Sequence, residues 1–180
     1  MSETDETASE ENKVPPATAL FEGNFTVKEN QRGISFDGLF GRHLKEATDI
    51  TVTDPYIRLF YQARNFMELL ETIVRNKPRG EVVKVRLITV EDEFKADQQR
   101  ENLDRIKDSC ENVDIDFSWE FDVSGTIHAR HIVTDNGWKI LLDRGLDIFQ
   151  HYDMGDSLSF SNRLQQQRQC KAFEVTFLKV

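Results

Sequence analysis

Cysteine, basic residues and long hydrophobic runs are all scarce in this 180-residue chain, and each shortage excludes a class of protein. Two cysteines, Cys110 and Cys170, are too few for a disulfide framework or for a zinc site built on cysteine. No stretch approaches the roughly 18–20 apolar residues that a membrane-spanning helix needs. Acidic residues outnumber basic ones by 32 to 23, and a net charge of −9 argues against a protein that mainly binds polyanions. We therefore expect a soluble, cytoplasmic protein without a transmembrane segment, a metal ion or a cofactor.

The hydrophobic content of the chain suffices for one folded domain that follows a polar tail. Hydrophobic residues make up 38% of the chain and include thirteen phenylalanines, which can form a substantial core. Residues 1–12 carry five acids and no large aliphatic or aromatic side chain after Met1, so they should be disordered and resemble neither a secretory signal nor a transit peptide. The pair Pro15-Pro16 marks the end of this stretch. We predict a disordered acidic tail over residues 1–16 and a single domain over residues 17–180.

Hydrophobic periodicity predicts that strands and helices alternate along this domain. Residues 113–121 show it best, because apolar side chains alternate there with acidic or hydroxyl ones, as on a strand with one exposed face. Further strands are predicted at residues 20–27, 49–54, 82–90, 127–134, 138–142 and 171–180, and helices at residues 35–47, 57–77 and 91–110. Asn136-Gly137 should join two of these strands in a tight hairpin. The order of elements predicts an α/β fold with a mixed β-sheet flanked by helices.

The hairpin segment carries the side chains that most suggest chemistry. On a strand, His128 and Arg130 project from the same face, since side chains repeat every two residues. An imidazole beside a guanidinium suits a phosphate, because the guanidinium can hold two oxygens while the imidazole approaches phosphorus. Asp135 could fix the tautomer of the imidazole or pair with Arg130 if the strand bends. The plain alternative is an exposed hairpin face that happens to carry His and Arg.

His128-x-Arg130-x4-Asp135 resembles the His-x-Lys-x4-Asp signature of the phospholipase D superfamily, with arginine in the lysine position. Motifs elsewhere extend the resemblance. They are Thr53–Arg58, Asn65–Glu68, Ile127–Arg130, Asn136–Ile140 and Arg144–Phe149. In this order, from about residue 30 to the C-terminus, they are similar to the phospholipase D-like C-terminal domain of MIT-domain-containing proteins. They look closer still to its bacterial relatives at the C-terminus of Lon-like proteins in BREX-type phage-defence systems.

The resemblance implies a phospholipase D-like fold and a role for each motif residue. In the superfamily, the histidine attacks phosphorus to form a phosphohistidine and the lysine neutralises the phosphoryl oxygens. His128 would then be the nucleophile, Arg130 the phosphate clamp and Asp135 the orienting residue. The Gly-Ser pair that usually follows the aspartate is missing, and the chain holds one such motif, so a complete active site would require a homodimer. The eukaryotic relatives are regarded as phosphoinositide-binding membrane modules, which favours binding over catalysis.

Four further side chains are candidates for ligand binding. Asp54 and Arg58 follow a predicted strand, where open α/β sheets tend to place ligands. Arg144, beside Gly145, could add a second phosphate donor, and Lys139 follows the predicted hairpin turn. The alternative for Asp54 and Arg58 is a structural ion pair or a helix-start charge, and for Arg144 it is an ordinary Arg–Asp pair.

Three functions remain open at this point. The first is a binding module whose degenerate site holds a phosphate-bearing ligand, either a lipid headgroup or a nucleic-acid phosphate, without turning it over. The second is a metal-independent phosphodiesterase or nuclease that acts through a phosphohistidine. The third is an oligomerising or protein-docking domain that serves a partner protein of a defence or trafficking system, since fold alone does not determine function. The acidic net charge favours a small local site over a long groove.

Overall fold

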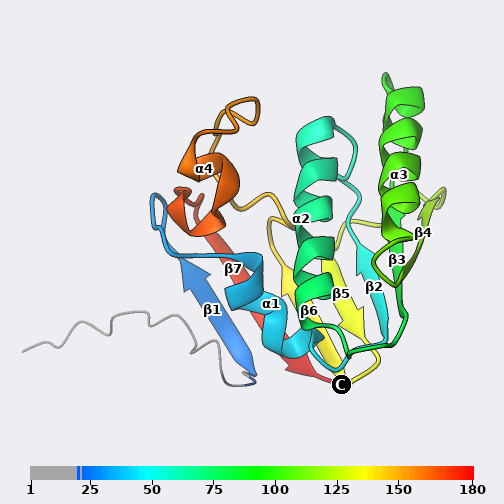
Figure 1. The fold of residues 1–180 in the computed structure, drawn as a ribbon, viewed down its shortest axis with the longest axis horizontal. Coiled ribbons are helices and arrows are strands. Elements are labelled where there is room, and N and C mark those ends of the chain that lie inside the picture. Colours follow the sequence, from blue (N-terminus) through cyan, green and yellow to red (C-terminus); the bar gives the residue numbers. More distant parts are fainter. Residues whose placement is uncertain (1–19, 21) are drawn as a thin grey trace, which may run out of the picture.

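The computed structural model describes residues 20 and 22–180 of the chain (Figure 1). The predicted tail over residues 1–16 lies outside the described residues. The strands are β1 (Gly23–Val27), β2 (Asp49–Thr53), β3 (Val83–Thr89), β4 (Ile115–Phe121), β5 (His131–Thr134), β6 (Trp138–Leu142) and β7 (Phe173–Lys179). The helices are α1 (Phe36–Leu44), α2 (Phe60–Asn76), α3 (Ala96–Cys110) and α4 (Phe160–Arg163), with a 3-10 turn η1 (Gln165–Gln167) after α4.

The seven strands form one mixed sheet in the order β1-β7-β6-β5-β2-β3-β4. β2, β3 and β4 are parallel, and α2 and α3 are the helices that connect them. β5 runs antiparallel to β2, and every remaining neighbour pair is antiparallel as well. This mixed sheet with its helices confirms the predicted α/β fold.

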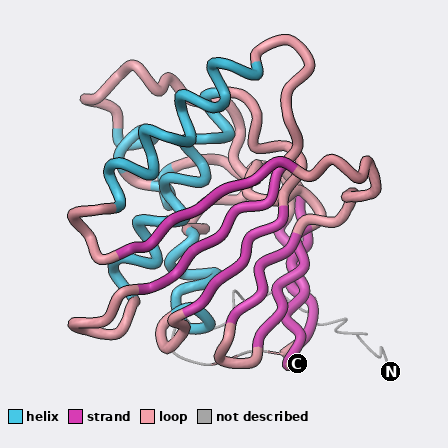
Figure 2. The backbone as a smooth tube through the Cα atoms, turned by 90° about the vertical axis from the view of Figure 1, so that its right-hand side faces the viewer, coloured by secondary structure: helices cyan, strands magenta, loops and turns pink. Residues whose placement is uncertain are grey.

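The helices α1, α2 and α3 lie on one face of the sheet, as Figure 2 shows from the side. Strand residues alternate between the two faces, so Val85 and Leu87 are buried under the helices while Arg86 is exposed on the other face. Phe66 of α2 packs against Phe117 of β4, with 5.3 Å between ring centroids. In the described part of the chain no helix covers the second face. The core therefore lies between the sheet and a single helix layer.

One edge of the sheet gathers the connections that build the candidate site. The parallel strands β2, β3 and β4 all end at this edge. Thr53 pairs with His131, and His131 pairs with Leu141, so β5 begins there and β6 ends there. The connections at this edge are residues 28–35, 54–59, 90–95, 122–130 and 143–172. Open α/β sheets commonly bind ligands at the edge where their parallel strands end.

The side chain of Gln62 caps the start of α2. Oε1 of Gln62 accepts hydrogen bonds from the backbone N–H groups of Arg58 (3.0 Å) and Leu59 (2.9 Å), which would otherwise lack partners at a helix N-terminus. The helix ends before Pro78, which has no N–H to continue it. Only residues 54–59 separate the end of β2 from α2, so the first turns of α2 lie at the edge where the parallel strands end.

Several predicted boundaries are wrong. β5 begins at His131 and not at residue 127, and residues 122–130 form neither helix nor strand. α3 begins at Ala96 and not at residue 91, because the carboxylate of Asp92 accepts hydrogen bonds from the N–H groups of Phe94 (2.9 Å) and Lys95 (2.8 Å) in a preceding turn. The hydrophobic pattern also does not predict α4 and η1, which lie within the long connection between β6 and β7.

Candidate functional site

A cavity of about 230 Å³ opens at the sheet edge where these connections meet. Its lining residues follow β2, precede β5, follow β6 or belong to the first turns of α2. They are Asp54, Tyr56, Ile57, Gln62, Asn65, Arg130, Arg144, Leu146 and Asp147. We call this space the strand-end cavity. Three segments that are far apart in the sequence build it, as expected of a ligand site in an open α/β sheet.

Asp54 is the buried acid of the strand-end cavity. Its backbone N–H donates to the carbonyl of Ile88 (3.0 Å), which places it directly at the end of β2. Its carboxylate accepts hydrogen bonds from the backbone N–H groups of Tyr56 (2.9 Å) and Leu146. Burial raises the pKa of this carboxyl to about 6, although those hydrogen bonds and the nearby Arg130 act to lower it. Asp54 therefore changes charge at a pH not far below neutral.

Gly145 allows the backbone after β6 to approach two cavity side chains closely. Its φ is +60°, in the left-handed region that favours glycine. A Cβ at this position would collide with the carboxylate of Asp54 and would lie 2.9 Å from Cδ of Arg130. The shape of the cavity therefore depends on the absence of a side chain at residue 145.

Arg130 brings a guanidinium group that an aromatic ring orients. Its Cζ lies 4.8 Å from the centroid of the Tyr56 ring, and Cζ of Arg58 approaches the same ring at 5.6 Å. Nε of Arg58 donates to the carbonyl of Pro55 (2.9 Å), so this side chain helps to hold the turn. The Arg130 guanidinium forms neither an ion pair nor a hydrogen bond with any residue that the structure describes. Its N–H groups are therefore available to an anion in the cavity.

Arg144 and Asp147 come from the connection after β6. Nε of Arg144 donates to the carbonyl of Ala172 (2.8 Å), and within residues 20 and 22–180 no carboxylate pairs with its guanidinium. Asp147 forms an ion pair with Lys171 at 2.8 Å, which offsets its charge. The cavity thus holds two arginines, Arg130 and Arg144, and only one acid that lacks an ion-pair partner, Asp54. The local electrostatic field favours an anion in spite of the acidic net charge of the chain.

His128 and Asp135 do not occupy the positions that the sequence predicts. His128 lies in the loop before β5, is exposed and does not line the cavity, so the prediction of a strand face shared with Arg130 is wrong. Asp135 follows the opposite end of β5, where its carboxylate accepts hydrogen bonds from the N–H (2.9 Å) and hydroxyl (2.7 Å) of Thr48. Burial raises the pKa of this carboxyl, but the hydrogen bonds outweigh it and leave the pKa below its ordinary value. Asp135 therefore cannot orient His128.

Lys139 does not line the strand-end cavity, and its contact with a ligand stays a prediction. It pairs with Val133 between β6 and β5 and lies on the sheet face that the described helices leave uncovered. Burial and, to a lesser extent, the charge of Lys139 lower the pKa of His131 on the same face. Of the other predicted ligand residues, Asp54, Arg130 and Arg144 line the cavity, and Arg58 contacts the ring of Tyr56.

Three polar or aromatic residues that line the cavity, Tyr56, Gln62 and Asn65, were not among the predicted ligand residues. Tyr56 could have been found as the aromatic side chain that follows Asp-Pro at the end of a buried strand. Asn65 is buried on the face of α2 that also carries Phe66 and Leu69. A polar side chain on the apolar face of an amphipathic helix usually has a partner or a function, and this is the signal that points to it. Gln62 is recognisable only from the hydrogen bonds that its side chain accepts from the backbone at the start of α2.

The chain resembles known proteins over most of its length. Residues 33–179 match the family described as the phospholipase D-like domain at the C-terminus of MIT. The chain belongs to this family. MIT domain-containing protein 1 of Mus musculus is 36% identical over 126 residues, which are 69% of this chain and 49% of that relative. The chain therefore spans about half the length of this curated relative.

Membership of this family confirms the predicted resemblance to the phospholipase D-like C-terminal domain of MIT-domain-containing proteins, while the closer kinship to BREX-type proteins stays a prediction. A comparison with solved structures finds the crystal structure of phosphatidylserine synthase from Haemophilus influenzae Rd KW20, at a TM-score of 0.42 and 8% identity. The match covers 87% of this chain and 34% of that chain.

The part of the chain that the structure describes lacks both a metal-binding cluster and a membrane-spanning helix. No group of three or more His, Cys, Asp or Glu side chains is arranged there to hold a metal ion. None of the described helices combines the length and apolar character needed to cross a membrane.

Proposed function

We propose that this phospholipase D-like domain binds a phosphate-bearing ligand in the strand-end cavity without turning it over. The main support is the pair of guanidinium groups, Arg130 and Arg144, that line the cavity and have no carboxylate partner among the described residues. Guanidinium groups bind phosphate oxygens through paired, charge-assisted hydrogen bonds. The ring of Tyr56 and the carbonyl of Ala172 orient the two groups before a ligand arrives, which reduces the entropy lost on binding.

The enzymatic alternative has less support from the geometry. A phosphohistidine requires an imidazole within reach of the phosphorus atom. His128 is exposed outside the cavity, and the carboxylate of Asp135 is held by Thr48 at the other end of β5. Arg130 would bind the phosphate, but no nucleophile from the predicted motif stands beside it. A binding role needs only the groups that the cavity brings together.

We further propose that the ligand is the headgroup of an anionic phospholipid. Large apolar side chains protrude from the connections at the same sheet edge as the cavity, with 72% to 96% of their surface exposed. They are Phe94, Val123, Leu158 and Phe160. Apolar side chains around a phosphate site suit contact with the interface of a bilayer, where the aromatic or aliphatic part can leave water. A nucleic-acid phosphate is less favoured, because the chain has a net charge of −9.

Further parts of the proposal rest on the sequence predictions. Residues 17–180 would form one domain, two copies would pair as a homodimer because the chain holds one motif, and the protein would act in the cytoplasm with a partner protein of a defence or trafficking system. Sedimentation velocity at micromolar concentration tests the pairing. A dimer is the expected species, and a monomer would contradict this part of the proposal without affecting the cavity.

Vesicle flotation tests ligand binding directly. The protein should float with phosphatidylcholine vesicles that contain phosphatidic acid and stay behind with phosphatidylcholine alone. Arg130→Ala and Arg144→Ala should each weaken binding about tenfold, which corresponds to about 1.4 kcal/mol. Arg79→Ala is the matched control, because this exposed arginine lies in the turn between α2 and β3, at the opposite edge of the sheet. Equal flotation with both kinds of vesicle, or wild-type flotation of both cavity variants, would contradict the proposal.

The same protein can be tested for turnover. Incubation with phosphodiester substrates in the presence of a divalent chelator should leave them intact. Metal-independent cleavage that disappears in the His128→Ala variant would instead establish the enzymatic alternative, because a contaminating nuclease would persist in the variant.

A further inference from the structure

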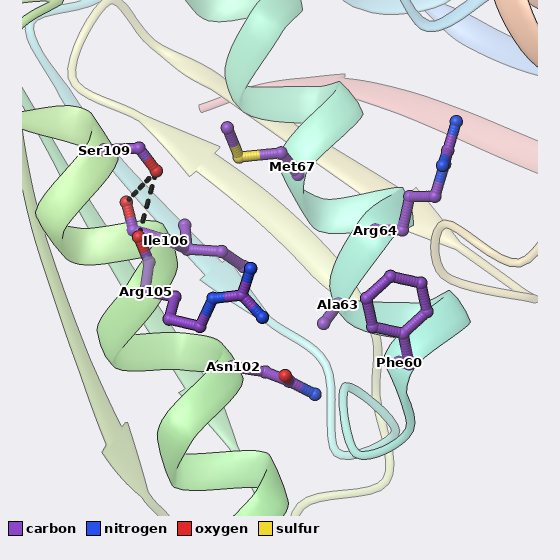
Figure 3. A pocket seen from close by; sticks show the side chains of 8 residues that line it. All are labelled: Phe60, Ala63, Arg64, Met67, Asn102, Arg105, Ile106 and Ser109. Atoms are coloured by element: carbon purple, nitrogen blue, oxygen red, sulfur yellow. Dashed lines mark hydrogen bonds between the residues drawn. The ribbon is translucent and has the colours of Figure 1, made fainter. Parts of the chain in front are cut away.

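A second hollow lies between α2 and α3 in the helix layer and shares no lining residue with the strand-end cavity (Figure 3). Its volume is about 240 Å³. Side chains of Ala63, Met67 and Ile106 give it an apolar surface, and Phe60, which is 60% exposed, lies at one end. We call this hollow the α2–α3 groove. It presents an apolar surface to solvent without a partner from the described part of the chain.

The polar side chains of the groove mainly offer hydrogen-bond donors. Arg105 lines it and forms no ion pair with a described residue. Arg64 also lines it, but its Nη2 donates to Oδ1 of Asn162 (2.6 Å) and its guanidinium points away from α3, so Arg105 is the cation that faces the groove. Asn102 is 6% exposed, and its Nδ2 has no hydrogen-bond partner among the residues that the structure describes, while its Oδ1 accepts from Gln98 (3.1 Å). The hydroxyl of Ser109 is engaged with carbonyls of its own helix. Hydrogen-bond donors that lack an acceptor favour an occupant that brings carbonyl or carboxylate oxygens.

The size of the groove restricts what it can hold. Sites for cofactors and drug-sized ligands usually enclose about 300–1,000 Å³. The α2–α3 groove is smaller than this range and is open along two helices that lie side by side. Its dimensions suit one large apolar side chain of a peptide segment, which is how small interface pockets receive the anchor residues of a partner.

The geometry points to a docking site for an acidic amphipathic segment of another protein. One large apolar side chain of that segment would lie between Met67 and Ile106. A carboxylate of that segment would face Arg105, and another of its oxygens would accept from Nδ2 of Asn102. Charge complementarity selects an acidic partner although the chain as a whole is acidic, because the charge of Arg105 lies at the groove and has no ion pair among the described residues. Apolar anchors with flanking acids at helical spacing are a common form of segment bound in a helix-lined groove.

Fluorescence anisotropy with defined peptides tests this inference on the full chain. The probe is a labelled amphipathic peptide of about sixteen residues that contains only leucine and glutamate at helical spacing. The comparison peptide has lysine in place of every glutamate. We expect saturable binding of the glutamate peptide and at least about tenfold weaker binding of the lysine peptide. Arg105→Glu should weaken the glutamate peptide about tenfold and strengthen the lysine peptide. The methyl resonances of Ala63 and Ile106 should shift on binding.

The matched control is Lys107→Glu, which makes the same charge change on the same helix but at an exposed residue that does not line the groove. It should alter affinity by less than about twofold. Arg105 is itself exposed, so thermal unfolding should show that both variants fold. Absence of saturable binding of the glutamate peptide, equal affinity for both peptides, or equal effects of Arg105→Glu and Lys107→Glu would each overturn the inference. Arg130→Ala should leave peptide binding unchanged, which separates this groove from the strand-end cavity.

Discussion

The guanidinium group of Arg168 lies buried against the carboxylate of Glu68, with Nη1 2.8 Å from Oε1 and Nη2 3.0 Å from Oε2. The ring of Tyr152 covers it, with 4.0 Å between Cζ and the ring centroid. The carbonyls of Ser161 and Asn162 accept further hydrogen bonds from the same side chain. Glu68 belongs to α2 and Arg168 to the connection between β6 and β7, which also lines the strand-end cavity. The pair therefore fastens a long connection of the site to the helix layer.

Arg168→Ala should destabilise the protein by about 3–5 kcal/mol, because it leaves the carboxylate of Glu68 partly buried without its partner. The side chains of Arg168 and Glu68 are only 1% and 14% exposed. Urea unfolding measures the loss. Arg75→Ala is the control, since Arg75 pairs with Glu71 at 3.7 Å on the surface and should cost less than about 1 kcal/mol. Equal losses in the two variants would show that the buried pair contributes no more than the exposed one.

Phe117→Ala should cost about 3–5 kcal/mol, because Phe117 is buried in β4 and packs against Phe66. Trp119→Ala should cost less. Trp119 lies on the same strand face but is only partly buried, and its Nε1 donates to Asp104 at the surface. Thermal or urea unfolding of the two variants checks the order. A larger loss for Trp119→Ala would mean that the core extends further along the edge strand than the structure indicates.

The fold was largely predictable, because its strands and helices carry strong periodicity. The alternation in β4 and the apolar run of β3 needed no tertiary information. Asp54 was also recognisable, since an acid directly after a buried strand lies where α/β sheets place ligands. Its proximity to Arg130 was less evident, because it depends on the antiparallel pairing of β2 with β5. Short-range patterns do not determine which strands become neighbours.

The rest of the candidate site could not be predicted because it depends on non-local contacts. The face on which His128 lies depends on where β5 begins, and β5 begins four residues later than predicted. Asp135 looked available for His128, but Thr48 binds it from a segment 87 residues away. The connection between β6 and β7 has weak periodicity of its own, and the Arg168–Glu68 pair holds it in place.

Gly145→Ala should weaken both stability and binding to vesicles that contain phosphatidic acid. The φ of +60° alone costs a side chain about 1–2 kcal/mol, and the new Cβ would also displace Asp54 and Arg130. Gly80→Ala is a matched control, because Gly80 has a φ of +78° and an added Cβ there meets nothing within 4 Å. Thermal unfolding and flotation should show a stability loss in both variants but a binding loss only in Gly145→Ala. Unchanged binding by Gly145→Ala would mean that the cavity tolerates the displacement.

Asp54 should make the stability of the protein depend on pH. Its pKa is about 6 in the folded state, compared with about 3.9 for an exposed aspartate in the unfolded chain. The folded state therefore holds the proton more tightly, so this contribution to stability is present below pH 4 and is lost as the pH rises from about 4 to 6. The change amounts to about 2–3 kcal/mol. Urea unfolding between pH 4 and 6 should show that the free energy of unfolding of the wild type falls relative to that of Asp54→Asn. If the two free energies change in parallel with pH, the raised pKa of Asp54 is wrong.

The same proton should control ligand capture. Protonation of Asp54 removes the one acid in the strand-end cavity that has no ion-pair partner, so Arg130 and Arg144 act on an anion without opposition from it. Binding to phosphatidylglycerol vesicles should strengthen several-fold as the pH falls from 7 to 5, because this phosphodiester keeps its charge while Asp54 loses its own. Asp54→Asn should bind at pH 7 as tightly as the wild type binds at pH 5, with little further change on acidification. An equally steep pH dependence in Asp54→Asn would show that Asp54 is not the group responsible.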